Sequence, residues 1–122
     1  MKYTRIYADA TGESHFEDVM VHFSPVEYAP PAMPINMSAP FKSERTIMCS
    51  IPSEWLGDWH PSPHKQFFMQ TSGRLEVETS DGEKRNFSPG SIILLEDTFG
   101  KGHLTRAMGY ASVHGVFIQL KD

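Results

Sequence analysis

Two histidines and a glutamine lie close together in the stretch "GDWHPSPHKQFF", residues 57–68: they are His60, His64 and Gln66. Imidazole is the commonest metal ligand in proteins, and an amide oxygen can add a further donor. The two prolines between the histidines favour extended backbone, on which residues two apart point to the same side. The pattern therefore predicts a metal site at the mouth of a strand. A pair of polar loop histidines without a metal is the alternative.

The elements that must position these residues are short strands. The predicted strands are Arg45–Ile51, Gln66–Ser72, Arg74–Ser80, Ser91–Asp97 and Tyr110–Leu120, with one or two more in the first 25 residues, including Val19–Phe23. Most are rich in β-branched or aromatic residues and are bounded by Gly, Pro, Ser or Asp. No window carries a helical stripe, so the sequence predicts an all-β chain with one domain over residues 1–122.

A proline-rich arm interrupts this pattern at Tyr28–Phe41. Four prolines exclude regular helix, but Met33, Ile35 and Met37 are too apolar for a solvated tether. We therefore expect an ordered arm within an N-terminal region of residues 1–44. An apolar arm needs a surface to lie on, and open sheet edges need cover. We predict a homodimer in which the N-terminal strands or the arm cross to the partner.

A wider pattern includes the first histidine and glutamine. Gln66 lies seven residues before Gly73, and His60 lies six residues before Gln66, with Ser62 between them. These residues resemble the first motif of the cupin family, in which two histidines, a glutamate and a glycine hold these positions. The resemblance implies a single jelly-roll β-barrel. Ser62 stands at the second histidine position, and His64, on the same side of an extended segment, is a candidate to replace that imidazole.

A second group of residues resembles the family's other motif. It comprises Gly82, Pro89–Gly90 and the "GKGH" that ends at His103, while Ala107 stands where the family has asparagine. The two motifs span residues 57–107, with a final strand at 110–120. The metal ligands that the resemblance implies are His60, His64, Gln66 and His103. Because this set lacks a carboxylate, Zn, Fe, Ni or Cu is a more plausible ion than Mg or Ca.

Other residues are candidates for supporting roles. Glu96 and Asp97 end a strand just before the loop to His103, where an acid can serve as a general base or hold a metal-binding histidine; a solvated strand end is the alternative. The residues predicted to line a ligand pocket are Ser62, Phe68, His114 and Trp59. For His114 the alternative is a core histidine bonded to a neighbour, and for Trp59 it is aromatic packing of a loop.

Composition excludes several classes of function. The 122 residues carry a net charge of −4 with scattered basic residues, so we expect no nucleic-acid or membrane partner. The single cysteine rules out a disulfide within the chain and fits a reducing compartment. The N-terminus lacks the apolar core of a secretory signal. We expect a cytoplasmic protein.

Fold class does not fix function, so two hypotheses remain. The first is a metal-dependent enzyme that acts on a small organic molecule, as a Lewis-acid isomerase or lyase or with dioxygenase-type chemistry. The second is a binding module that holds a small molecule without reacting it. The row of polar side chains favours the enzyme, and the missing carboxylate favours the binding module.

Overall fold

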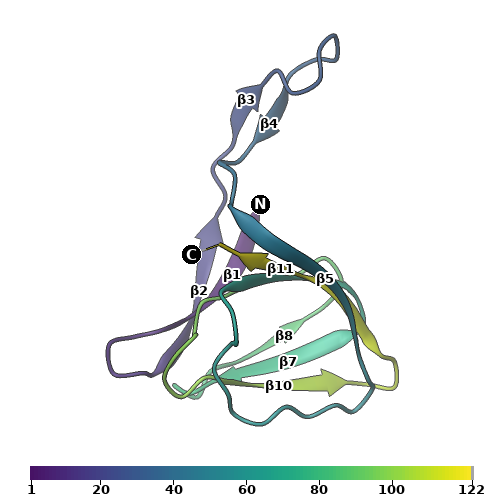
Figure 1. Cartoon of the computed structure of the whole chain (residues 1–122). Helices are drawn as coiled ribbons and strands as arrows, with labels where there is room; N and C mark the ends of the chain where they lie inside the picture. Colours follow the sequence, from purple (N-terminus) through teal and green to yellow (C-terminus); the bar gives the residue numbers. More distant parts are fainter. Residues whose placement is uncertain (122) are drawn as a thin grey trace.

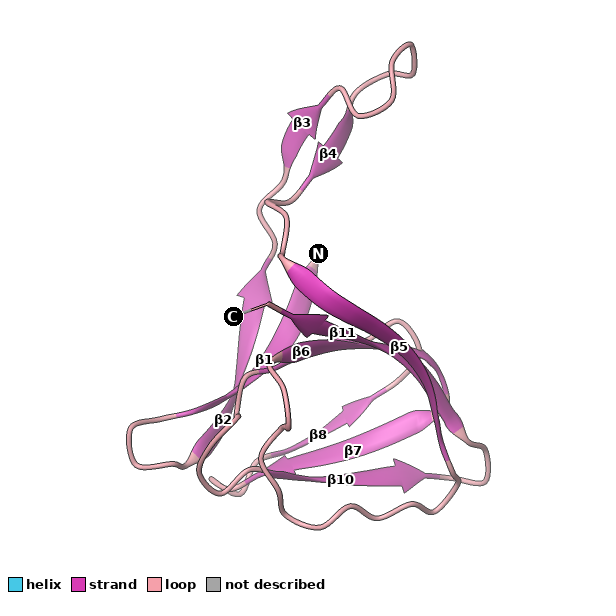
Figure 2. Ribbon diagram, viewed as in Figure 1, coloured by secondary structure: helices cyan, strands magenta, loops and turns pink. Residues whose placement is uncertain are grey.

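β-Strands account for all the regular structure in the computed structural model, which describes residues 1–121 (Figures 1 and 2). They are β1 (Lys2–Ala8), β2 (Ser14–Met20), β3 (Ser24–Val26), β4 (Ile35–Met37), β5 (Ser43–Ile51), β6 (Gln66–Ser72), β7 (Arg74–Thr79), β8 (Lys84–Phe87), β9 (Ile92–Leu95), β10 (His103–Met108) and β11 (Val113–Leu120). The all-β prediction is confirmed. Over residues 1–121, no helix has the length and apolarity that crossing a membrane requires.

Two sheets face each other. The larger has the strand order β2-β1-β9-β6-β11-β5, in which β1 and β9 pair in parallel and the other neighbours are antiparallel. The smaller has the order β10-β7-β8 and lies across from the curved larger sheet in Figure 2. Strand pairing thus gives a jelly roll of two facing sheets rather than one continuous barrel wall.

Side-chain alternation explains how these strands share one core. On β7, Leu75, Val77 and Thr79 are buried, whereas Glu76 and Glu78 between them are only half-buried, as the alternating "RLEVET" predicts. On β9, Ile93 faces the core, whereas Leu94 is buried on the opposite face of the strand. The core cluster joins Ile6 and Ile93 of the larger sheet to Leu75 and Val77 of the smaller one.

The predicted strand at Val19–Phe23 is wrong in its bounds. β2 ends at Met20, which pairs with Lys2 at the start of β1. The backbone N–H of Val21 donates to the carbonyl of Met1, at 2.9 Å, and the chain then leaves the sheet.

Beyond this point the chain forms an arm that is longer than the predicted Tyr28–Phe41. From here on, the arm means residues 23–41, which include the short antiparallel strands β3 and β4. Figure 1 shows the arm projecting away from both sheets, with the two chain ends near its base. At its root Phe41 packs edge-on against Phe67 of β6, with ring centroids 4.9 Å apart. The far end of the arm stands clear of the sheets (Figure 1).

Candidate functional site

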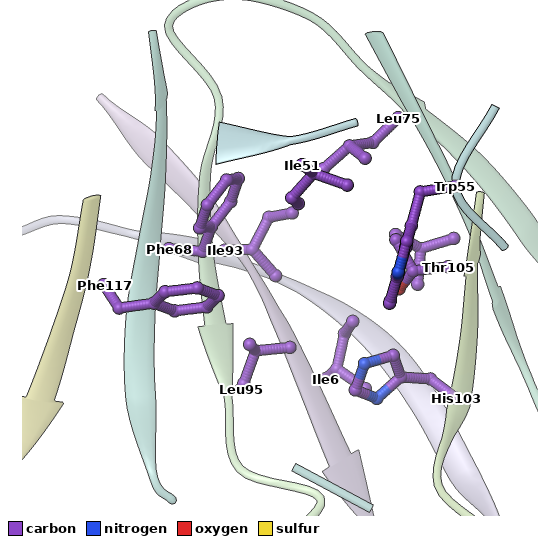
Figure 3. A pocket seen from close by; sticks show the side chains of 11 residues that line it. Ile6, Ile51, Trp55, Phe68, Leu75, Ile93, Leu95, His103, Thr105 and Phe117 are labelled. Atoms are coloured by element: carbon purple, nitrogen blue, oxygen red, sulfur yellow. The ribbon is translucent and has the colours of Figure 1, made fainter. Parts of the chain in front are cut away.

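A small pocket lies between the two sheets (Figure 3). Its volume is about 100 Å³. Its walls include Ile6, Phe68 and Ile93 from the larger sheet, Leu75 and Val77 from the smaller one, and Trp55 from the segment before His60. The polar groups on this wall belong to His103, Thr105 and the indole N–H of Trp55. The pocket is therefore suited to an apolar molecule with one polar group.

The imidazole of His103 is held by a buried carboxylate. Its Nδ1 lies 2.6 Å from Oδ2 of Asp97, and the two residues are 5% and 0% exposed. An ionised carboxylate only accepts hydrogen bonds, so the proton of this bond lies on Nδ1. With this tautomer of a neutral imidazole, Nε2 is an acceptor. The described residues give Nε2 no hydrogen-bond partner. Figure 3 shows the ring at the pocket wall beside Ile6.

The carboxylate of Asp97 has a second notable feature. Its Oδ1 is buried and has no hydrogen-bond partner among the described residues. Buried acceptors are nearly always bonded to protein or water, so this atom needs a partner from outside the chain. Asp97 is not among the residues that line the pocket, so at the pocket wall it is Nε2 of His103 that a hydroxyl group or a water molecule would satisfy.

Backbone pairing places His60 next to His103. The two residues exchange backbone hydrogen bonds of 3.3 and 3.1 Å, so the segment before the first proline runs beside β10 as an irregular edge strand. The imidazole centroids lie 5.4 Å apart. Gly102 permits this approach, because its φ is +73° and a Cβ there would overlap the carbonyl group of His60. The predicted proximity of these histidines rests on that glycine.

The residues between the prolines and β6 do not form one extended row. Residues 63–65 form a bend, so the expected two-residue alternation fails there. His64 is exposed, whereas Ser62 and Gln66 are buried. The Ser62 hydroxyl donates to the carbonyl of His64 at 2.6 Å, and the Gln66 amide donates to Ser62 at 3.4 Å. These two side chains thus stabilise the bend rather than line the pocket.

The predicted metal set is incomplete in this arrangement. Among residues 1–121, no group of three or more His, Cys, Asp or Glu side chains is placed to hold a metal ion. Nδ1 of His60 lies 2.5 Å from the carbonyl of Asp58, so each of the two imidazoles keeps only Nε2 for a ligand. A catalytic metal usually has three protein ligands. Two imidazoles do not fit such a centre, and we derive no chemical step through a metal.

The two predicted acids have different roles. Glu96 accepts a 2.6 Å hydrogen bond from Nε of Arg5, and its other oxygen lies 3.3 Å from Nζ of Lys65. These ion pairs occupy both carboxylate oxygens of Glu96. Asp97, one residue later, is turned inward and bonds His103. Of the two acids, only Asp97 is part of the candidate site.

The residues predicted to line the pocket separate into inner and outer positions. Phe68 lines the pocket. The other three predictions are corrected. Ser62 stabilises the bend, as described above. Trp59 is 43% exposed beside Ser80 and Lys101, and His114 is exposed on the outer face. The reason for His114 is alternation on β11, where Phe117 lines the pocket and residues an odd number of positions away face outward.

Trp55, rather than Trp59, forms part of the pocket wall. The preceding Glu54 has a φ of +65°, a conformation that non-glycine residues rarely adopt. The Trp55 carbonyl accepts a 2.8 Å bond from the N–H of Ala107 on β10. Gly57 leaves room for the indole ring, since a Cβ there would lie 2.5 Å from it. The strained turn and the glycine are not visible as a pocket signal in the sequence.

Comparisons with known proteins test the fold. No protein-family model matches the sequence, and the curated proteins include no significant match. Among solved structures, the cupin domain of Cnp3 from Schizosaccharomyces pombe is similar, with a TM-score of 0.51 and 12% sequence identity over 99% of this chain and 84% of that one. At this identity the likeness concerns the fold alone. The chain has the cupin fold, an all-β jelly roll.

Proposed function

We propose that this protein binds a small, mostly apolar organic molecule between its two sheets, with a hydroxyl group of that molecule donating to Nε2 of His103. The observation that carries the proposal is the imidazole at the wall of an otherwise apolar pocket, with its Nδ1 held by a buried carboxylate. A polar group so placed fixes the orientation of a ligand, while apolar walls supply affinity.

The volume limits the size of the ligand. A dry apolar cavity of about 150 Å³ accepts benzene, and the pocket here measures about 100 Å³. Trp55 lines the pocket and is 39% exposed, so a ligand can extend toward the surface past its ring. The best match is a molecule with one small ring or a short branched chain and a single hydroxyl group.

The first experiment compares phenol with anisole, which has a similar shape but no O–H donor. Calorimetry on the wild type should show phenol binding about tenfold more tightly, the effect of one net hydrogen bond. In His103→Gln, whose amide can still donate to Asp97, the preference for phenol should disappear. Thr105→Val is the matched control, because it removes a different polar side chain of the wall and leaves His103 in place. Equal affinities in the wild type would refute the proposal.

A second candidate function is proton transfer. A carboxylate bonded to Nδ1 holds a histidine in the tautomer that lets Nε2 act as a general base. A ketone in the pocket would then lose an α-proton to Nε2 and become its enolate, and the proton would later return. In deuterated water the wild type should speed deuterium incorporation at the methyl groups of acetone, and His103→Gln should not. No acceleration would leave binding as the function.

A further inference from the structure

A second hollow lies on the outer face of the larger sheet, at the root of the arm. This outer groove has a volume of about 780 Å³. Its floor comprises Tyr3, Phe67, Met69, Ile92 and Ile118 from the sheet, and the arm root supplies one wall. None of the residues that line it is an Asp, Glu, Lys, Arg or His. The groove is separate from the interior pocket, whose walls face the other side of the same sheet.

The arm beside the groove is also apolar and carries a single charged residue. Glu27 is the only charged residue in its 19 positions, against 21% charged residues for the whole chain. Tyr28 is 67% exposed, Met33 85% and Ile35 50%. Large apolar side chains on a projecting hairpin have no stabilising role in a single copy, because they contact little else. They require a covering surface.

We propose that the arm of one copy occupies the outer groove of a second copy, forming a two-fold symmetric dimer. The arm and the groove are adjacent on one chain and match in character, so two copies related by a two-fold axis bury both features of both chains. The arrangement also suits the net charge of −4, because copies that repel each other overall would meet through their uncharged surfaces.

The apolar surface available is of the right size for such an interface. Each aromatic side chain buries roughly 150–250 Å² when fully covered, and Phe23, Tyr28 and Phe41 are 41%, 67% and 50% exposed. These three rings alone would bury on the order of 300 Å² from each arm. The remaining apolar residues of arm and groove bring the total toward the roughly 800 Å² per partner of a stable interface.

The test measures self-association by sedimentation over a range of concentrations. The wild type should sediment as a dimer, twice the chain mass of 13.8 kDa. The arm variant is Tyr28→Lys with Met33→Lys, and the groove variant is Met69→Lys. Each variant should weaken both of the arm–groove contacts in the symmetric dimer, by on the order of 30-fold per contact. The dissociation constant of the dimer should therefore rise by roughly 1,000-fold. Added lysines reduce the net negative charge, so charge repulsion between copies cannot account for a loss.

Tyr110→Lys is the matched control, because Tyr110 is 97% exposed in the turn after β10, away from arm and groove. It should leave the dimer unchanged. Mixing the two variants provides a second test that requires both to be folded. A mixed dimer has one contact with an intact arm and an intact groove, so native mass spectrometry should show it in preference to either variant's own dimer.

Four results would overturn the proposal. The first is a wild type that stays monomeric, as expected if the arm folds back on its own groove. The second is a monomer that binds lipid vesicles through the arm. The other two are variants that dimerise as well as the wild type, and variants whose mixture forms no mixed dimer. None of these results depends on whether phenol binds the interior pocket.

Discussion

The interior pocket and the outer groove lie on opposite faces of the same strands, yet their chemistry differs. On β6, Phe68 faces the pocket while Phe67 and Met69 face the groove; on β9, Ile93 and Ile92 divide in the same way. The pocket is small and contains an imidazole with a buried carboxylate partner. The groove is about eight times larger by volume and has no ionisable side chain among Asp, Glu, Lys, Arg and His.

This difference indicates what each hollow can recognise. A single oriented acceptor among apolar walls discriminates between small molecules, because an unpaired polar group inside it is costly. An uncharged open groove has no oriented acceptor of this kind, and a partner gains binding energy there mainly from the apolar area that it covers. The pocket therefore suits a small ligand, and the groove suits a protein surface.

The largest effect is expected for Gly102→Ala. The added Cβ would overlap the backbone of His60, and the left-handed φ would strain any non-glycine residue, so the free energy of unfolding should fall by roughly 2–4 kcal/mol. Gly90→Ala is the matched control: its φ is +93°, but no atom lies within 4 Å of the added Cβ. It should lose only about 1–2 kcal/mol. Urea unfolding measures both, and equal losses would show that the contact with His60 is unimportant.

A smaller effect, confined to the pocket, is expected for Asp97→Asn. The amide would donate to Nδ1 of His103 and move the ring proton to Nε2, which would then donate to the oxygen of phenol or of anisole alike. The roughly tenfold preference for phenol over anisole should therefore disappear. Nitrogen-15 NMR of the imidazole reports the tautomer directly. The account is contradicted if the tautomer changes and the preference for phenol does not.

The fold could be predicted from the sequence more fully than the site. Alternation on β7 and the apolar run of β9 are local signals, and both placed strands correctly. The contact between His60 and His103 also followed from the motif positions. The orientation of His64 could not be predicted, because the bend at 63–65 depends on hydrogen bonds of Ser62 and Gln66 that only the folded chain forms.

The pocket walls were hard to predict for a related reason. Trp55 reaches the interior through a left-handed residue, Glu54, and through space left by Gly57. Neither residue has a pattern that distinguishes it from an ordinary turn. His114 seemed a candidate because its strand is apolar, but its position relative to Phe117 puts it outside. Which face of a two-sided apolar strand points inward depends on register with its neighbours.

A modest effect far from both hollows is expected at His15. Its two ring nitrogens lie 2.7 Å from Asp9 and 3.0 Å from Asp81, and the hydrogen bond to Asp9 is the main cause of its raised pKa. The resulting stability is complete below about pH 6.5, the unfolded value, and is lost as pH rises through the higher folded pKa. Calorimetry should show the melting temperature falling above neutral pH in the wild type and falling less in His15→Gln. Parallel pH profiles would refute this role.

No effect is expected from removing metal. Because the site provides only two imidazole donors, dialysis against EDTA should leave the melting temperature and the affinity for phenol unchanged. Elemental analysis of protein purified without a histidine tag is the complementary measurement. One equivalent of Zn, Fe, Ni or Cu per chain, lost together with phenol binding, would restore the metal centre that the sequence motifs imply.

The most direct test of the central claim is a methyl NMR titration with phenol, read at the isoleucines. Ile6, Ile51 and Ile93 line the interior pocket, whereas Ile92 and Ile118 line the outer groove. If the pocket is the ligand site, the methyl signals of the first three should shift with one common saturation curve while those of the other two stay in place. Shifts concentrated at Ile92 and Ile118, with Ile6 and Ile93 unchanged, would contradict the account.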